Sequence, residues 1–326
     1  MTRKARPTGK RAARGRRKRK PGAIYLYPEA QAGPPQPPAS VSEPPRKVAF
    51  VLSGGGNRGP LEVGAMLALL EHNIHPQILV GTSVGAINAA AAAGDLTPDG
   101  LRRLAGTWVE IANHDVLTSR IGILWRIITR KEGLIPSEKL KRLVEEHIPP
   151  NMRFFYDIQD VELYIVAANL NTLRMHVFGL DKTESVVDAI MASSALPPYF
   201  APWYYRGQQY VDGVVVADLP VRVALKQGAD EVYAVDLGYS GPVKQNVSGL
   251  FNIVRRSIKT MTQQQIQSEL DYPGESSESQ GRIHHIVVKR FYDLPLWDLS
   301  YTSQMIDEGH RVAEEYLSTI SQSRAV

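Results

Sequence analysis

A serine held between two glycines, where an apolar segment gives way to an alanine-rich one, constrains this chain more than any other feature. The pentapeptide 81–85 is Gly-Thr-Ser-Val-Gly, with the apolar run 78–80 before it and the helix-favouring run 85–93 after it. Such a pattern is typical of a nucleophile elbow, a tight turn between strand and helix that exposes a serine hydroxyl. The sequence therefore predicts that Ser83 is a nucleophile; the alternative is an ordinary turn bounded by glycines.

A second glycine cluster, Gly-Gly-Gly-Asn-Arg-Gly at 54–59, lies shortly upstream. It follows the unbroken apolar run 48–52, which predicts a strand buried on both faces. Pro60 suits the first position of a helix, and apolar residues continue to Leu70. Because glycine has no Cβ, the backbone of such a loop can approach a substrate closely. We therefore expect two successive strand–loop–helix units at the start of the fold.

Apolar runs alternate with helical patterns along the rest of the chain. Further strands are predicted at 163–168, 175–178, 209–211, 232–235 and 286–288, and further helices near 186–195, 220–227, 249–270 and 306–317. This alternation predicts an α/β fold, a three-layer α/β/α sandwich with a mostly parallel central sheet. The polar segment 273–281 is predicted to be a solvent loop.

The first 47 residues differ in composition from the rest. Residues 1–22 hold eleven Lys or Arg and no acid, whereas 23–47 are rich in proline. The formal net charge is +5, so removing these eleven positive charges leaves −6 for the remainder. We predict a disordered basic and proline-rich tail over 1–47 and one folded hydrolase domain over 48–326.

Three interpretations of the tail remain open: a solvated tail, attraction to anionic membrane lipids, and nucleic-acid binding. Nucleic acid is disfavoured because the first 24 residues hold no aromatic side chain for base stacking and the folded part is acidic. The apolar segment 23–27 is too short for a secretion signal, and no run approaches the length of a membrane span. With no cysteine in the chain, we expect a cytoplasmic protein without disulfides that contacts the membrane peripherally at most.

A serine nucleophile needs a base within hydrogen-bond reach. Of the eight histidines, only His310 lies where an α/β-hydrolase would place its base, late in the chain after an acid. Its polar helical surroundings favour a surface position. Asp212 is the better candidate, since it ends the strand-like run 209–211 and precedes Gly213. The alternative for Asp212 is an Asp-Gly hairpin turn.

Taken together, these segments resemble the patatin-like phospholipase family, bacterial type. The matching segments are the glycine-rich loop 54–59, the elbow 81–89, a recurrent segment 192–200, the Asp-Gly pair 212–213, and the segments 219–221 and 228–232 that follow it. The first four of these, from the glycine-rich loop to the Asp-Gly pair, are motifs in order at compatible spacing, which is a specific signal. The basic tail and the residues after about 290 lie outside the resemblance, apart from a similar closing helix.

The resemblance implies a Ser–Asp dyad without histidine. Ser83 would attack an ester carbonyl and Asp212 would accept its proton. The oxyanion hole would be formed by Gly54, Gly55 and Gly56, chiefly by the N–H groups of the last two. The resemblance implies neither a metal nor an organic cofactor.

It also assigns Arg58 and Val84 to substrate binding, although Arg58 either adds positive charge near a lipid phosphate or braces the loop. The chain departs from the family at Val214, where Gly or Ala is usual, and at Asp218, where Asn is frequent. Neither change removes a catalytic atom. We expect Asp236, which ends an apolar run, to be structural.

The segment 121–131 has a tryptophan among aliphatic and basic residues, which is typical of a membrane-interfacial segment or of a helix covering the core or a substrate tunnel. We expect a lipid acyl hydrolase of the phospholipase A or lysophospholipase type. The alternatives are a non-catalytic lipid-binding or interaction protein on the same fold and a serine esterase that uses a histidine base. The sequence does not predict the oligomeric state.

Overall fold

The structure is a computed structural model that describes residues 46–113, 135–238, 241, 246–272, 282–295 and 298–324. These residues belong to one compact unit, Pro45–Val326. The predictions for residues 1–45, for the segment 121–131 and for the loop 273–281 lie outside the described residues. The division of the chain at residue 47 stays a prediction.

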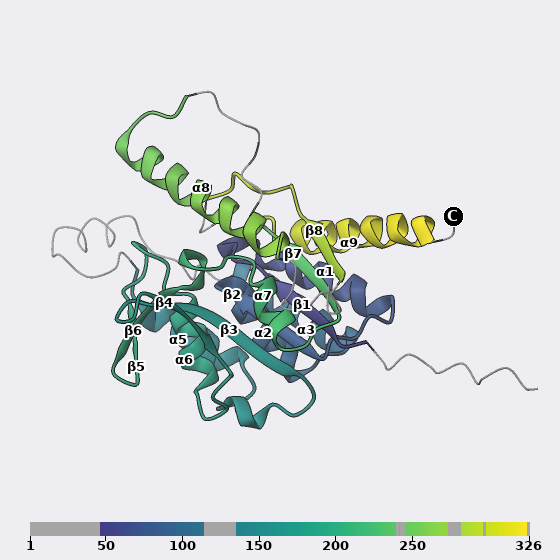
Figure 1. Ribbon diagram of the computed structural model, residues 1–326, viewed down its shortest axis with the longest axis horizontal. Helices are drawn as coiled ribbons and strands as arrows, with labels where there is room; N and C mark the ends of the chain where they lie inside the picture. Colours follow the sequence, from purple (N-terminus) through teal and green to yellow (C-terminus); the bar gives the residue numbers. More distant parts are fainter. Residues whose placement is uncertain are drawn as a thin grey trace, which may run out of the picture. The chain divides into compact units, whose positions relative to one another are not determined.

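An eight-stranded sheet forms the centre of the described unit (Figure 1). Its strands are β1 (Val48–Leu52), β2 (Ile78–Thr82), β3 (Glu162–Asn169), β4 (Arg174–Phe178), β5 (Trp203–Tyr205), β6 (Gln208–Asp212), β7 (Glu231–Asp236) and β8 (Arg282–Val287). The order is β5-β6-β3-β2-β1-β7-β8, with β4 also paired to β3. Strands β3, β2, β1, β7 and β8 run parallel, while β4, β5 and β6 pair antiparallel, so the predicted mostly parallel sheet is confirmed.

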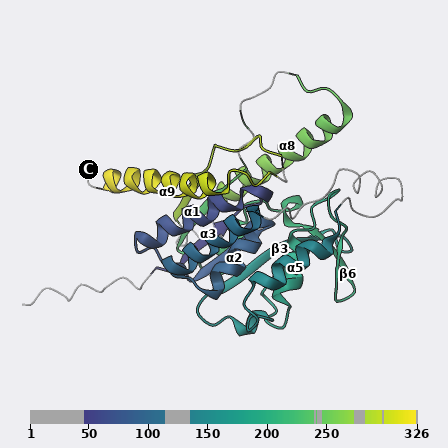
Figure 2. The same cartoon turned by 180° about the vertical axis from the view of Figure 1, so that it is seen from behind.

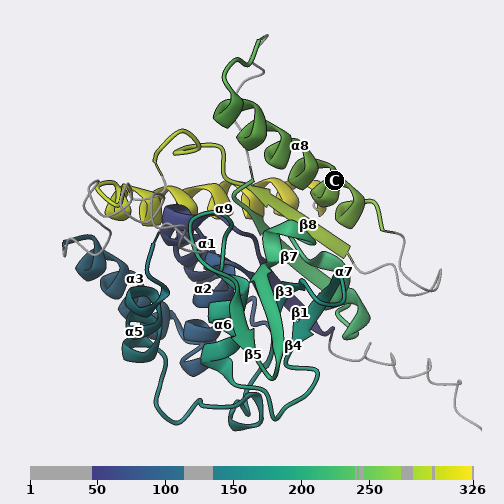
Figure 3. The same ribbon diagram turned by 90° about the vertical axis from the view of Figure 1, so that its left-hand side faces the viewer.

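Helices cover both faces of the sheet. They are α1 (Gly59–Glu71), α2 (Val84–Gly94), α3 (Pro98–Asn113), α5 (Ser137–His147), α6 (Val186–Ser193), α7 (Val221–Lys226), α8 (Leu250–Leu270) and α9 (Thr302–Arg324), with 3-10 turns η1 (Gly56–Arg58), η2 (Phe155–Asp157) and η3 (Gly213–Val215). Figures 1 and 3 show α7 and α8 on one side of the sheet, and Figure 2 shows α1, α2 and α3 over the other. None of the described helices is both long enough and apolar enough to cross a membrane.

Alternating side chains of each strand supply two separate cores, because successive Cβ atoms of a strand point to opposite faces. Phe50 and Leu52 pack with the side that includes α1, α2, α6 and α9. Ala49 and Val51 pack with the side that includes α7 and Ile266 of α8. Burial on both faces explains the unbroken apolar run of β1. The predicted three-layer sandwich is therefore confirmed.

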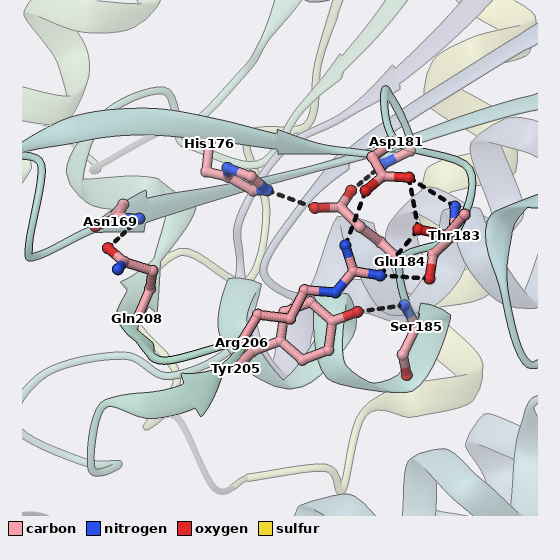
Figure 4. Close-up of polar contacts among 10 residues, drawn as sticks. Asn169, His176, Asp181, Thr183, Glu184, Ser185, Tyr205, Arg206 and Gln208 are labelled. Carbon is pink, nitrogen blue, oxygen red and sulfur yellow. Dashed lines mark hydrogen bonds and ion pairs between the residues drawn. The ribbon is translucent and has the colours of Figure 1, made fainter.

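The hairpin formed by β5 and β6 is joined by polar contacts to the turn that precedes α6 (Figure 4). Arg206 donates to the Asp181 carboxylate at 2.8 Å and to the Thr183 carbonyl at 2.7 Å. The Ser185 N–H donates to the Tyr205 hydroxyl at 3.0 Å. The Arg206–Asp181 pair is half exposed, so it is a surface contact of modest strength.

Candidate active site

Ser83 occupies the turn between the end of β2 and the start of α2. Its φ of 56° and ψ of −121° lie in a region that residues with a Cβ seldom adopt. A Cβ on Gly81 would lie 2.3 Å from the Gly85 carbonyl oxygen, and one on Gly85 would lie 2.5 Å from that of Leu52. Glycine is therefore required on both sides of Ser83. The turn has the geometry of a nucleophile elbow, as the pentapeptide predicts.

Ser193, the last residue of α6, holds the backbone of this turn. The Ser83 N–H donates to the Ser193 Oγ at 2.9 Å, and the same Oγ donates to the Val166 carbonyl at 2.6 Å. Ser193 is fully buried, so these bonds are not shared with bulk water. The sequence predicts that the segment 192–200 recurs in the family that it resembles. Nothing in that segment indicates that Ser193, and not Ser194, accepts from the Ser83 N–H.

Asp212 is brought to Ser83 by the register of the sheet. Thr82 pairs with Val166, and Asp212 pairs with the next residue of β3, Ala167. The Ser83 Oγ donates to the Asp212 Oδ2 at 2.7 Å. The structure thus brings the predicted nucleophile and the predicted base into direct hydrogen-bond contact.

The Asp212 carboxyl group is fully buried. Burial raises its pKa to about 7, while hydrogen bonds from the Val214 N–H, at 2.9 Å, and from Ser83 act in the opposite direction. A carboxylate with a pKa near neutrality is suited to accept a proton at physiological pH. Gly213 and Val214 begin the turn η3, so the alternative of an Asp-Gly hairpin turn is wrong.

The glycine loop has two N–H groups without a hydrogen-bond partner among the described residues. The Gly54 N–H donates to the Asp218 Oδ1 at 2.9 Å, so it is not available to an oxyanion, contrary to the predicted role of Gly54. The N–H groups of Gly55 and Gly56 donate no hydrogen bond within the described part of the chain. Gly56 also lines the cavity at Ser83. The geometry is therefore compatible with an oxyanion hole formed by Gly55 and Gly56.

An apolar cavity of about 150 Å³ opens beside Ser83. Its lining includes Val84, Ile87, Trp108, Leu140, Leu196 and Phe200. Val84 lines this cavity, and its role in substrate binding stays a prediction. Arg58 does not line this cavity, and its Nη1 is buried without a hydrogen-bond partner among the described residues.

A buried polar network supports the wall of this cavity. The Trp108 Nε1–H donates to the Asn88 Oδ1 at 3.0 Å, and the Asn88 Nδ2 donates to the Glu62 Oε2 at 2.8 Å and to the Gly59 carbonyl at 2.9 Å. Burial raises the pKa of Glu62 well above its usual range. The network joins α1, α2 and α3, which fixes the Trp108 indole beside Ser83.

His310 lies on α9 with its Nε2 at 2.8 Å from a carboxylate oxygen of Glu71 on α1. Among the described residues, no histidine lines the cavity at Ser83. Glu71, His310 and Glu314 are the one group of described residues spaced like metal ligands. Arg102 pairs with Glu71 and His72 pairs with Glu314, so ion pairing already accounts for this group.

A larger cavity of about 540 Å³ lies elsewhere, near the first residues of β1 and β7. Its lining includes Arg46, His72 and Glu231. Ser83 follows the carboxyl end of β2, which runs parallel to β1, so this cavity lies at the opposite edge of the sheet. The larger of these two cavities is therefore not the one beside Ser83.

Comparison with known proteins gives consistent similarities. The family model for patatin-like phospholipase matches residues 50–225, more than half of the chain. Patatin-like phospholipase domain-containing protein 7 of Rattus norvegicus is 28% identical over 194 residues, which cover 59% of this chain and 14% of that protein. Lysophospholipase NTE1 of Meyerozyma guilliermondii is 28% identical over 193 residues, 59% of this chain and 12% of that protein. The chain thus spans less than a fifth of the length of either relative.

Solved structures with a similar chain course share little sequence. VipD from Legionella pneumophila gives a TM-score of 0.46 at 15% identity, over 85% of this chain and 67% of that one. Human GIVD cytosolic phospholipase A2 gives a TM-score of 0.42 at 10% identity, over 84% of this chain and 60% of that one. On the extent of the family match, the chain belongs to the patatin-like phospholipase family.

Proposed function

We propose that this protein hydrolyses lipid acyl esters, as a phospholipase A or a lysophospholipase does, with a Ser–Asp dyad. The observation that carries the proposal is the 2.7 Å hydrogen bond from the Ser83 Oγ to the buried Asp212 carboxylate. This pair lies beside an apolar cavity suited to a hydrocarbon chain. The family match and the name of the lysophospholipase relative support the substrate class.

In the first half-reaction, the Ser83 Oγ attacks the ester carbonyl carbon while its proton passes to the Asp212 Oδ2. The oxyanion that forms accepts hydrogen bonds from the N–H groups of Gly55 and Gly56. Each donor of this kind contributes about 3 kcal/mol to transition-state stabilisation. The tetrahedral intermediate then collapses, the C–O bond breaks, and the leaving alcohol takes the proton from Asp212.

The second half-reaction releases the acyl group from Ser83. A water molecule gives its proton to the Asp212 carboxylate and attacks the acyl-enzyme carbonyl. The new tetrahedral intermediate expels the Ser83 oxygen, which recovers the proton from Asp212. Val84, Trp108 and the other apolar residues of the cavity would hold the acyl chain throughout.

The histidine-base alternative is not supported by the position of His310. Its ring pairs with Glu71 on the outer side of α1, whereas Ser83 already has a buried carboxylate at hydrogen-bond distance. The non-catalytic alternative would use the same cavity without turnover. It predicts that Ser83 does not react with an electrophile.

A fluorophosphonate probe tests the proposal, because it labels only a serine whose proton can be removed. We expect labelling at Ser83, located by mass spectrometry, and none in Ser83→Ala. We also expect release of fatty acid from a lysophospholipid or phospholipid by the wild type and not by Ser83→Ala. Labelling without hydrolysis of any lipid in a panel would retain the nucleophile and contradict the substrate class.

We further propose that residues 1–22 attract the protein to anionic membranes. Eleven positive charges without an acid support this, since each basic residue near an anionic surface contributes about 1 kcal/mol. The proposal requires charge alone and no defined structure of the tail.

A further inference from the structure

We infer that Asp218 and Arg58 are positioning residues that together orient the peptide groups of the glycine loop, and that Arg58 does not contact the substrate. This rests on the proposed function, because the loop matters for catalysis only if Gly55 and Gly56 bind an oxyanion. It gives Arg58 one of the two roles that the sequence left open and gives Asp218 a role that the sequence did not suggest.

Asp218 fixes the first peptide of the loop. Its Oδ1 accepts from the Gly54 N–H at 2.9 Å, and its backbone oxygen lies 3.3 Å from the same nitrogen. The approach is close, since a Cβ on Gly54 would lie 2.7 Å from that Oδ1. The Thr82 hydroxyl donates to the Ala217 carbonyl at 2.9 Å, which fastens the segment before Asp218 to the end of β2. Asp218 thus holds the loop, while its neighbour Ala217 contacts the last residue of the strand that precedes Ser83.

Arg58 contacts the third peptide of the loop. Its Nε donates to the Gly55 carbonyl at 3.3 Å, and its own backbone N–H lies at the same distance from that oxygen. The second peptide is held by Ser53, whose hydroxyl lies 3.4 Å from the Gly54 carbonyl oxygen. The loop is therefore held at three successive peptide groups.

These contacts determine the direction in which the N–H groups of Gly55 and Gly56 point. In a trans peptide the C=O and the N–H point in opposite directions. The Gly55 carbonyl faces Arg58, so the N–H of the same peptide, which belongs to Gly56, points away from Arg58. The Gly54 carbonyl faces Ser53, so the Gly55 N–H points away from Ser53. The two N–H groups that have no partner among the described residues thus point away from the groups that hold the loop.

Nearby carboxyl groups act on the charge of Arg58. Burial lowers the pKa of Arg58, and three carboxyl groups act in the opposite direction, those of Asp218, Asp236 and Glu62. In turn, Arg58 counters the effect of burial on Asp218, the pKa of which is raised to about 7. A buried charge is retained when an opposite charge compensates it. Arg58 does not line the cavity beside Ser83, and its Nε contacts the Gly55 carbonyl instead.

The test compares matched substitutions on a neutral, soluble acyl ester that carries no phosphate. Asp218→Asn keeps an oxygen acceptor for the Gly54 N–H, whereas Asp218→Leu has a similar size and no acceptor. We expect Asp218→Leu and Arg58→Met each to lower kcat at least about 10-fold with little change in KM, because the loop serves the transition state. Asp218→Asn should keep most of the wild-type kcat.

Amide hydrogen exchange of the segment 53–59 gives a readout that does not depend on activity. We expect faster exchange in Asp218→Leu than in wild type and in Asp218→Asn. Asp181→Leu and Arg206→Met, which remove an exposed Asp–Arg pair (Figure 4), are matched controls that should alter neither exchange of this segment nor kcat. If Asp218→Leu does not fold, kcat and amide hydrogen exchange are both measured on Arg58→Met.

Two results would overturn the inference. One is wild-type exchange and wild-type kcat in Asp218→Leu. The other is an Arg58→Met protein with normal kcat on the neutral ester and a raised KM only for phospholipids, because that pattern means Arg58 binds the phosphate. A wild-type protein without any esterase activity would instead contradict the proposed function, and the exchange measurement would still decide the orientation of the loop.

Discussion

Ser83 and Asp212 are 129 positions apart in the chain, yet the Ser83 Oγ donates to the Asp212 Oδ2 at 2.7 Å. Asp212 ends β6, and Ser83 directly follows Thr82, the last residue of β2. Thr82 and Asp212 pair with consecutive residues of β3. The distance between the two groups therefore depends on the register of the sheet and not on a flexible loop. This contact supports the proposal that Asp212 acts as the base without a histidine.

The pH dependence of hydrolysis should follow the ionisation of Asp212. The carboxyl group must be ionised to accept the Ser83 proton, and burial raises its pKa to about 7. We expect kcat/KM on a soluble ester to rise with pH through about 7 and then to level off. His310→Ala should show the same rise. If His310→Ala no longer showed the rise of kcat/KM with pH, the rise would be due to His310 and not to Asp212.

The free energy of unfolding should fall as pH rises through the range in which hydrolysis becomes faster, because both depend on the ionisation of Asp212. The raised pKa means that the folded protein holds the Asp212 proton between about pH 4 and 7, where the unfolded chain has released it. The contribution of this group to the free energy of unfolding is therefore full below about pH 4 and is lost as pH rises through 7. Asp212→Asn should be more stable than wild type at pH 8, by a few kcal/mol, with a smaller difference at pH 5. Thermal unfolding at both pH values measures this, and an Asn variant less stable than wild type at pH 8 would contradict it.

Ser193 should matter for rate more than for substrate affinity. Ser193→Ala removes the acceptor of the Ser83 N–H, so we expect kcat to fall about 10-fold or more with little change in KM. Ser185→Ala is the matched control on the same helix, since Ser185 caps α6 by accepting from the Asp188 N–H. That control should lose about 1 kcal/mol of stability and keep its kcat. Equal kcat values for the two variants would contradict the prediction that Ser193 helps to position Ser83.

Deletion of residues 1–47 should separate membrane binding from catalysis. We expect unchanged hydrolysis of a soluble ester and weaker co-sedimentation with anionic vesicles, because eleven basic residues are removed. Binding of the full chain to these vesicles should fall steeply with added salt, and neutral vesicles should show little difference. Equal binding of both proteins to anionic vesicles would leave the solvated-tail or nucleic-acid interpretation.

Features with a local signature could be predicted from the sequence. The strand β1 was evident because its apolar run is unbroken, and Ser83 because glycine flanks a strand-to-helix turn. The helix α5 was not predicted, since it is mostly polar and buries only Val144 completely. The contacts of Ser193 with Ser83 and of Asp218 with Gly54 join residues 110 and 164 positions apart. Such contacts depend on the three-dimensional arrangement of the chain, and nothing in the neighbouring sequence indicates them.

The most direct test of the account is the kcat of four proteins on one soluble acyl ester: wild type, Ser83→Ala, Asp212→Asn and the double variant. We predict that each single variant loses at least about 1,000-fold and that the double variant is no worse, because the two groups act as one proton-transfer unit. Circular dichroism confirms that the variants are folded. Wild-type turnover by a folded Asp212→Asn protein would contradict the Ser83–Asp212 dyad.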